Sequence, residues 1–450
     1  MNHIQKPFQF SAMKDEADFI RKMESAGITL PCRKDLQVLA APLRLGQKTL
    51  PNRLAVHPCE GFDGTADGKP TQTVVRRYRR YAQGGSGLIW FEAVAATPDG
   101  RCNPYQLMLN DDTAASIASL VEATREAARA ADAAPRYLAI QMTHSGRSAV
   151  DANWKQIPLV AFRNPYQDPY YTNITVADDS RIERLRDEMV HAAELAAQAG
   201  FDAVDVKLCH NYIMRELLAG FTREGRYGGS YENRTRFIFE VIEGIRQRVG
   251  TKIDICVRLN AYDCIPYPYG WGMLQKEGVM QYDLAEPIRL IRELCGKDVR
   301  LINISTMMPR YSPNDTGFLD SYQKTANLNP YRNTATLLQA IRELKQAVPE
   351  AVIVATGLSW YENYGPNVAA GGVADGWFDL AGFGRQAMAY PDYAADLMGK
   401  GRLEPGKCCV TCDKCYELIG MHQITGCVVR DREVYLPLYQ EGKRKGGSQR

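Results

Sequence analysis

Short runs of apolar and β-branched residues recur along the chain, and most are followed by a longer stretch with apolar positions at helical spacing. The eight runs predict strands over 53–57, 87–93, 137–142, 203–207, 253–259, 301–304, 352–355 and 378–382. The helical stretches between several of them are 116–131, 184–200, 236–250, 286–296 and 334–348. No GxGxxG follows the first strand, which argues against a Rossmann start. The pattern predicts an α/β fold, a (β/α)8 TIM barrel of parallel strands.

The rest of the chain divides around this barrel. Residues 1–40 form an N-terminal extension with a helical stretch, KDEADFIRKMESAG, and the barrel is predicted over 41–400. A cysteine-rich segment follows over 401–438, and the polar tail 439–450 is predicted to be disordered. The Pro-, Asn- and Tyr-rich connection 145–180 follows a barrel strand, where loops of this length are usually functional.

Composition and charge exclude several classes of protein. The chain has 450 residues, 45% of them hydrophobic, a formal net charge of +3, and no basic block beyond Lys443, Arg444 and Lys445. We therefore expect no nucleic-acid partner and no membrane partner. No apolar run approaches the roughly 20 residues that a membrane span needs. The N-terminus lacks the apolar region of a signal peptide, so a cytoplasmic location is expected.

Five of the twelve cysteines lie within residues 408–427. In a reducing compartment such a cluster indicates a metal site, whereas the seven scattered cysteines are expected to be packed as small hydrophobic residues. The spacing Cys409-x2-Cys412-x2-Cys415-x11-Cys427 is typical of an iron–sulfur site, because a zinc site more often shows two separated pairs. The sequence therefore predicts one [4Fe–4S] cluster, with Cys408 as an alternative ligand to Cys409.

Polar side chains occur at the ends of the predicted strands, where a TIM barrel forms its active site. Gln141 ends the third strand, Lys207 the fourth and Arg258 the fifth, and His210 and Tyr212 follow Lys207 closely. A buried Arg258 needs an anionic or electron-rich partner, which is either a barrel carboxylate or the edge of a bound flavin.

The last two strands end in glycines. Gly357 follows the seventh strand, and Gly384 and Arg385 follow the eighth, where TIM barrels commonly bind phosphate. Glycines allow backbone N–H groups to approach a phosphate, and an arginine adds charge. The alternative is a pair of turn glycines beside a surface arginine.

Several stretches together resemble the old yellow enzyme family of NADH:flavin oxidoreductases. They are PLRLGQKTLPNRLAVHPCEGFDGTADGKPTQ, GLIWFEAVAATPDGR, IQMTHSGRSA, AGFDAVDVKLCHNYI, RYGGSYENRTRF and DLAGFGRQAMAYPD, in order from about residue 41 to about 395. The cysteine segment resembles the branch that contains 2,4-dienoyl-CoA reductase and trimethylamine dehydrogenase.

This resemblance implies an FMN cofactor and a role for each matching residue. Pro58, Cys59 and Glu60 would line the flavin, Gln141 would meet its pyrimidine edge, and Arg258 its N1 and O2 side. Gly357, Gly384 and Arg385 would hold the phosphate. Lys207 and His210 fall on the substrate-binding pair, and Tyr212 on the proton donor.

Departures from the family pattern change parts of this expectation. Glu60 stands where Thr or Cys is usual, Lys207 where His or Tyr is usual, and Gly220 replaces a proline. Cys59 lies one place before the position that attaches flavin covalently in trimethylamine dehydrogenase, so noncovalent FMN is expected. No nucleotide-binding domain follows residue 427, so slow direct turnover with NADH or NADPH is expected.

The expected function is hydride transfer between flavin N5 and a small organic substrate, most readily reduction of an activated C=C bond. Electrons would pass singly through the cluster to or from a separate carrier: a ferredoxin, an electron-transfer flavoprotein or a partner subunit. Two alternatives remain open, an amine-type dehydrogenase and an electron-transfer subunit with a vestigial substrate site. Assembly into a homo-oligomer also remains open.

Overall fold

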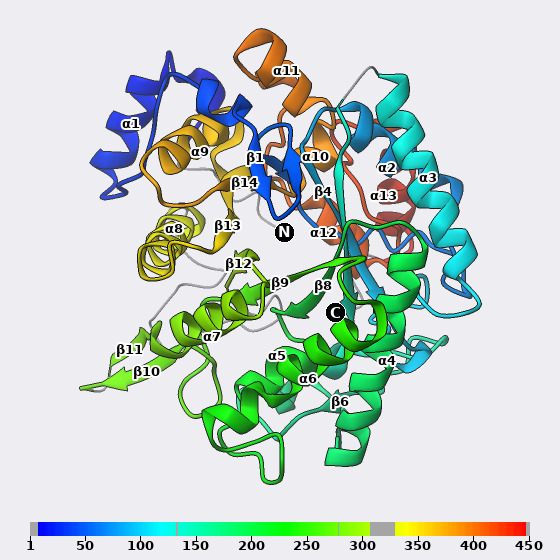
Figure 1. The fold of residues 1–450 in the computed structure, drawn as a ribbon. Helices are drawn as coiled ribbons and strands as arrows, with labels where there is room; N and C mark the ends of the chain where they lie inside the picture. The colour runs from blue at the N-terminus through cyan, green and yellow to red at the C-terminus, as the bar shows by residue number, and fades with distance from the viewer. Residues whose placement is uncertain (1–7, 132–133, 278, 307–328, 447–450) are drawn as a thin grey trace.

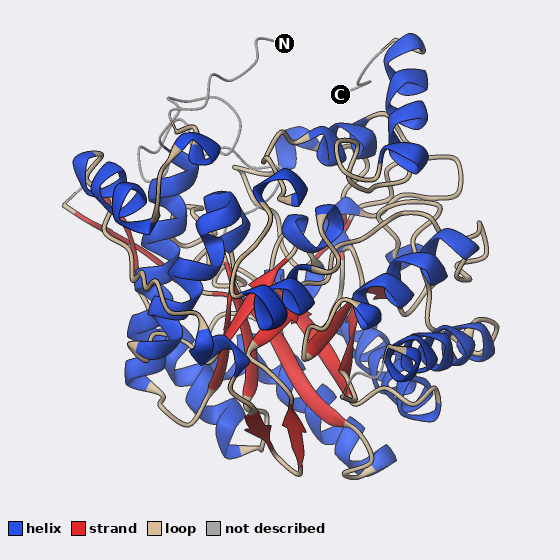
Figure 2. Cartoon of the chain, turned by 90° about the horizontal axis from the view of Figure 1, so that it is seen from above, coloured by secondary structure: helices blue, strands red, loops and turns tan. Residues whose placement is uncertain are grey.

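Eight parallel strands close into a barrel at the centre of the molecule (Figures 1 and 2). The structure is a computed structural model that describes residues 8–131, 134–277, 279–306 and 329–446. The barrel strands, in spatial order, are β3 (Leu54–Val56), β4 (Leu88–Ala95), β5 (Tyr137–Thr143), β8 (Ala203–Leu208), β9 (Asp254–Asn260), β12 (Leu301–Ser305), β13 (Val352–Ala355) and β14 (Leu380–Phe383). Each coincides with one predicted run, so the predicted TIM barrel is confirmed.

Helices connect successive strands or, in the case of the last two, follow the last strand, and together they surround the barrel (Figure 2). They are α2 (Gln72–Gln83), α3 (Ala114–Ala130), α4 (Asp179–Gln198), α5 (Ile213–Leu218), α6 (Tyr231–Val249), α7 (Ala285–Gly296), α8 (Asn329–Ala347), α9 (Gly365–Ala374), α10 (Arg385–Ala389) and α11 (Tyr393–Lys400). In α6, Ser230 caps the first turn and Gly250 ends the helix at φ +62°. No described helix is both long enough and apolar enough to cross a membrane.

The barrel interior changes from apolar to polar along the strands. Its amino end is filled by a cluster that includes Leu88, Trp90, Cys256 and Leu301. The hairpin of β1 (Leu43–Leu45) and β2 (Lys48–Leu50) adds Leu45 and Leu50 to this cluster and so closes that end. A second hairpin, β10 (Met273–Lys276) with β11 (Val279–Tyr282), and a short pair, β6 (Leu159–Val160) with β7 (Thr175–Val176), lie outside the barrel.

Asp205 marks the boundary between the apolar and polar layers. Its carboxylate accepts hydrogen bonds from Trp90 Nε1 (2.9 Å), Gln141 Nε2 (2.5 Å) and the backbone N–H of Arg258 (2.7 Å). Burial raises the pKa of Asp205 to about 6, and the hydrogen bonds from Gln141 and Arg258 oppose that rise. Because all three partners are donors, the ionised carboxylate is the form that satisfies them.

The N-terminal extension packs on the outside of the barrel. Its helix α1 (Glu16–Ser25) begins at Asp15, whose side chain accepts the N–H of Asp18. Phe19 stacks on Tyr364 of the segment after β13 at a centroid distance of 4.8 Å. The predicted helix in this extension is confirmed, and residues 1–7 lie outside the described residues.

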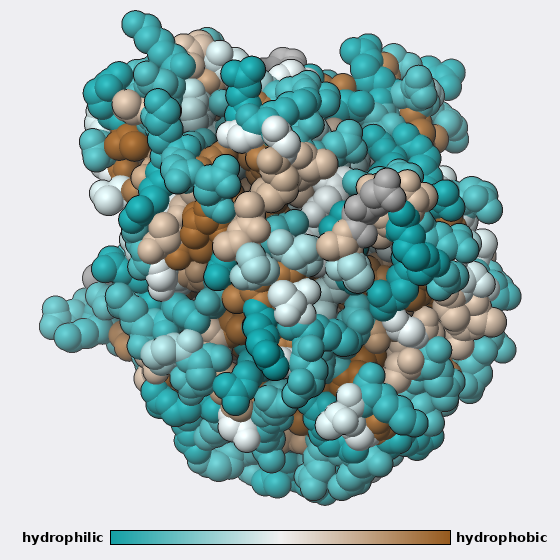
Figure 3. Space-filling view, turned by 45° about the horizontal axis from the view of Figure 1, so that its top comes forward, coloured by the Kyte–Doolittle hydropathy of each residue, from teal (hydrophilic) through white to brown (hydrophobic). Residues whose placement is uncertain are grey.

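The C-terminal segment forms two helices, α12 (Lys414–Gly420) and α13 (Arg432–Arg444), which pack through Leu418, Val428 and Tyr435. The prediction of disorder from residue 439 is wrong as far as residue 444. Tyr439 donates a hydrogen bond to Glu417 (2.8 Å), and Lys443 pairs with the same carboxylate (2.7 Å). These contacts stabilise the end of α13 over residues 439–444, whose sequence lacks the apolar spacing typical of a helix. Figure 3 shows one face of the molecule, largely hydrophilic with hydrophobic residues in scattered recesses.

The carboxylate of Asp205 generates a stability prediction. Asp205→Asn places an amide NH2 group against donors, and leaving a buried donor unpaired costs about 1–3 kcal/mol. We expect urea unfolding at pH 8 to show a loss of that size. The control is Asp254→Asn on the neighbouring strand, since an amide oxygen can still accept the 2.7 Å hydrogen bond from Tyr137. Equal stability of the two variants would contradict this account.

Candidate functional site

The predicted cofactor and substrate residues gather at the carboxyl end of the barrel. Pro58, Cys59 and Glu60 follow β3, Gln141 lies in β5, Lys207 in β8, Arg258 in β9, Gly357 follows β13, and Gly384 follows β14. In a parallel barrel all these positions face the same end. We call this end the barrel mouth.

Lys207, Tyr212 and Glu60 form one contact cluster in the mouth. The Lys207 ammonium lies 3.6 Å from the centroid of the Tyr212 ring and 3.5 Å from Glu60 Oε1. The Tyr212 hydroxyl donates to the same Glu60 oxygen at 3.0 Å. Lys207 is buried while the Glu60 side chain is 19% exposed, so this carboxylate remains within reach of solvent.

Tyr212 and His210 are both held neutral. Burial, together with Cys102 and Glu60, raises the pKa of Tyr212 well above its usual value. Desolvation and the positive charges of Arg258 and Lys207 lower the pKa of His210 well below its usual value. A neutral phenol can donate a proton, and a neutral imidazole can donate one hydrogen bond and accept another.

The backbone positions His210 toward the mouth. His210 adopts φ +62°, a left-handed conformation in which histidine is enriched among non-glycine residues. Its N–H donates to Asn260 Oδ1 (3.3 Å), and its carbonyl accepts from Arg215 (2.9 Å). Its Nε2 lies 3.3 Å from Ser305 Oγ at the end of β12. Contacts to two elements therefore hold the His210 backbone, and a third element contacts its ring.

Arg258 is a buried cation without a carboxylate partner. The residue is 7% exposed, and its Nε has no hydrogen-bond partner. Throughout the described ranges, no Asp or Glu lies within ion-pair distance of this side chain, so the predicted alternative of a barrel ion pair is not realised. A buried guanidinium in this state fits an electron-rich or anionic group bound in the mouth.

Neighbouring side chains leave no room for a Cβ at either of the two predicted phosphate-loop glycines. Gly357 has φ +94°, and a Cβ there would meet Thr334 at 2.8 Å. A Cβ at Gly384 would lie 2.9 Å from Cys59 Sγ. Arg385 pairs with Asp413 of the cysteine segment at 2.6 Å and lies over the Trp360 ring at 4.2 Å. Arg385 thus joins the predicted phosphate loop to the cysteine segment.

Two functional candidates escaped the sequence analysis. Asp205 organises Gln141 and Arg258, and the only signal for it is an acid inside the apolar run VDVKL. His57 lies below the mouth, where Asn303 Nδ2 is 3.0 Å from its Nδ1 and Ala355 O is 3.2 Å from its Nε2. Burial and the Arg258 charge lower the pKa of His57 to about 3, so its ring is neutral.

The four predicted cluster cysteines lie in one region of the C-terminal segment. Burial raises the pKa of Cys409 to about 11 and that of Cys415 to about 12, and the thiol of Cys412 contributes to both rises. Cys412 also contributes to the raised pKa of Cys427. Cys408 differs, since its thiol donates to Glu404 O (3.4 Å).

Backbone groups already face two of these sulfurs. The N–H of Thr411 lies 3.4 Å from Cys409 Sγ, and the N–H of Arg430 lies 3.4 Å from Cys427 Sγ. Within the part of the chain that the structure describes, no group of three or more His, Cys, Asp or Glu side chains is arranged to hold a metal ion. The N–H of Thr425 donates to Gly61 O (2.7 Å), next to Glu60, so the segment lies against the mouth.

Comparison with solved structures identifies proteins of the same fold. A 2-naphthoyl-CoA reductase complexed with 2-naphthoyl-CoA superposes with a TM-score of 0.71 at 21% identity, over 90% of this chain and 58% of the other. Histamine dehydrogenase from Rhizobium sp. 4-9 gives a TM-score of 0.66 at 22% identity, over 88% and 52%. At these identities the likeness shows the fold alone.

Among curated proteins, an NADH:flavin oxidoreductase of Gibberella zeae is 26% identical over 282 residues, which cover 59% of this chain and 66% of that protein. The chain thus spans just under two thirds of this relative's length. The model of the NADH:flavin oxidoreductase / NADH oxidase family, which is an FMN-binding family, matches residues 38–400. This match takes in the whole barrel and its mouth, and the chain belongs to the NADH:flavin oxidoreductase / NADH oxidase family.

Proposed function

We propose that this chain is an FMN-dependent oxidoreductase that reduces an activated C=C bond of a small organic substrate. The observation that carries the proposal is the buried Arg258 guanidinium, which has no carboxylate partner among the described residues. It lies in the same mouth as two neutral proton-carrying groups, Tyr212 and His210. Family membership supports FMN as the group that Arg258 meets.

The residues of the mouth fit FMN. Pro58, Cys59 and Glu60 would line the ring, Gln141 would face the pyrimidine with its free carbonyl oxygen, and Arg258 the N1 and O2 side. Gly357, Gly384 and Arg385 would hold the phosphate, with Arg385 also paired to Asp413 of the cysteine segment. When bound, FMN supplies a hydride donor and acceptor at N5. Burial raises the pKa of the Cys59 thiol, which agrees with noncovalent attachment.

The substrate would lie over the Lys207–Tyr212–Glu60 cluster. Lys207 and His210 would hydrogen-bond the carbonyl or carboxylate that activates the double bond, which draws electron density away from it. Tyr212 keeps its proton, because its pKa is raised, until a carbanionic carbon develops beside it. Glu60, which accepts the Tyr212 hydroxyl at 3.0 Å, would hold that hydroxyl in position between turnovers.

The positive charges of Lys207 and Arg258, of which Glu60 offsets one, favour this reaction over amine oxidation. An ammonium in the mouth repels a cationic amine and attracts an electron-rich carbonyl. Aromatic faces commonly bind cationic amines, and one aromatic residue of the loop 262–271, Trp271, is fully buried with its Nε1 donating to Asn260 O (3.0 Å). The organised contacts of Tyr212 and His210 argue against a vestigial substrate site.

Cys409, Cys412, Cys415 and Cys427 would hold one [4Fe–4S] cluster. Their spacing, their mutual effect on pKa and the N–H groups that face two sulfurs support this assignment. The contact of Cys408 with Glu404 O favours Cys409 as the ligand. When bound, such a cluster exchanges one electron at a time, which requires a separate one-electron carrier.

Replacing Tyr212 with Phe tests the proton donor. We expect turnover of an unsaturated substrate to fall about 10²- to 10⁴-fold, the usual contribution of a positioned acid, while flavin reduction by dithionite is unaffected. Stopped-flow reoxidation of the reduced enzyme by substrate measures this step. Tyr105→Phe, at an exposed tyrosine, is the control. Normal reoxidation in the Tyr212 variant would assign the proton to another group.

Replacing Lys207 with Met tests carbonyl recognition. A hydrogen bond to a charged group contributes roughly 1.5–3 kcal/mol, so the apparent substrate constant should rise about tenfold or more with unchanged flavin content. The competing view is that Lys207 only pairs with Glu60. In that case Lys207→Met should destabilise the protein, and adding Glu60→Gln should restore its melting temperature. Unaltered substrate affinity in Lys207→Met would rule out the recognition role.

A further inference from the structure

Helix α2 carries an arginine-rich face beside the cysteine segment. Its sequence, QTVVRRYRRYAQ, has four arginines and no acidic residue. Tyr78 divides the four arginines into two pairs, so they form no uninterrupted basic run. Arg77 turns inward, where it binds Asp63 (2.7 Å) and Glu92 (2.6 Å). The other three, Arg76, Arg79 and Arg80, reach the surface.

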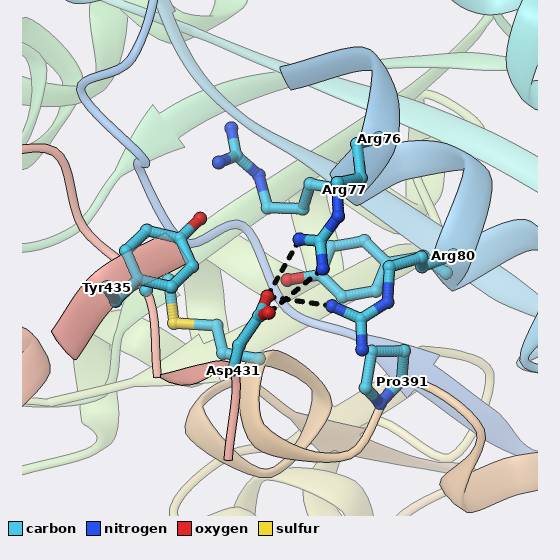
Figure 4. Close-up of a pocket in the computed structure, with 9 residues that line it drawn as sticks. Arg76, Arg77, Arg80, Pro391, Asp431 and Tyr435 are labelled. Carbon is cyan, nitrogen blue, oxygen red and sulfur yellow. Dashed lines mark hydrogen bonds and ion pairs between the residues drawn. The ribbon is translucent and has the colours of Figure 1, made fainter. Parts of the chain in front are cut away.

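A shallow hollow in the surface follows these three arginines. Its lining is Gln72, Val75, Arg76, Arg79, Arg80 and Gln83. Arg76 and Arg80 share one carboxylate, that of Asp431, with each contact at 2.8 Å (Figure 4). Arg79 is exposed and makes no ion pair with any residue in the described ranges. The three guanidiniums are opposed by the carboxylate of Asp431 and by the nearby Glu433, which also acts on Arg76, so this face keeps a net positive charge.

The arginine face is joined directly to the proposed cluster segment. The N–H of Asp431 donates to the carbonyl of Cys427 at 2.9 Å, so the residue that binds Arg76 and Arg80 also closes the turn after the last cysteine. Figure 4 shows Asp431 between the two arginines, with Tyr435 of α13 nearby. A protein seated on this face would lie next to the cysteine segment.

We propose that the face formed by Arg76, Arg79 and Arg80 docks an acidic protein that carries one electron at a time. This proposal rests on the proposed function. It adds the surface of this chain that binds the one-electron carrier and the negative charge of that carrier. Two reduced carrier molecules, each oxidised by one electron, and two protons balance the reduction of one C=C bond. Because the whole chain carries only +3, attraction of an acidic partner depends on local charge such as this.

A nucleic acid is a poorer fit to the same surface. The residues that line the hollow include no aromatic side chain on which a base would stack, and only three bear positive charge. A protein that exchanges electrons with the cluster, in contrast, needs only an attractive charge on the surface beside the cluster. Such charges chiefly change the association rate and make it depend on salt.

The test uses the full chain and an oxidised plant-type [2Fe–2S] ferredoxin as the acidic probe, so binding is measured without turnover. Arg79→Glu should weaken binding about tenfold or more at low ionic strength, and 0.5 M salt should remove most of the difference. The matched control is Arg44→Glu, which makes the same charge change on the hairpin at the amino end of the barrel. It should bind the probe as the native chain does.

Three outcomes would overturn the proposal. They are equal binding by the Arg79 and Arg44 variants, weak binding by the native chain at low salt, and equally tight binding of a random DNA duplex. Arg79→Glu should also slow reduction of the enzyme by chemically reduced ferredoxin in stopped flow. Iron analysis tests the cluster separately, so loss of docking and absence of a cluster are distinguishable.

Discussion

The positively charged guanidinium of Arg258 is buried at the carboxyl end of the barrel. Its charge affects the hydrogen bonding and the protonation of the polar groups around it. Asp205 accepts the backbone N–H of Arg258 while its own carboxylate holds Gln141 and Trp90. The same positive charge helps to keep His57 and His210 neutral. This arrangement suits a bound group with negative or electron-rich character, such as FMN in the mouth.

The mouth and the cysteine segment form one connected structure. Arg385 reaches from the end of β14 to Asp413, and the loop after β3 accepts a backbone hydrogen bond from Thr425. On the outer side, Asp431 ties the same segment to α2. The proposed substrate chemistry, single-electron exchange and partner docking would therefore involve parts of the chain that contact one another.

The strands and most helices were predictable because their apolar residues repeat at the period of the element that they form. The presence of functional side chains at the strand ends was predictable, because charged residues such as Lys207 interrupt apolar runs there. Other features depend on partners far away in the chain. Asp205 is important because residues of three different strands donate hydrogen bonds to its carboxylate. Helix α2 was not predicted, because its sequence is largely polar. Residues 439–444 are helical because Tyr439 and Lys443 contact Glu417 of the preceding helix.

The most direct test is the cofactor content of the anaerobically purified chain, compared with that of Arg258→Met. The native chain should release about one FMN on acid precipitation and contain about four irons and four sulfides. The Arg258 variant should keep its iron and lose most of its FMN. Zinc without sulfide, or a native chain without flavin, would contradict the proposed pairing of FMN with a [4Fe–4S] cluster, and full FMN content in Arg258→Met would contradict the role of this guanidinium.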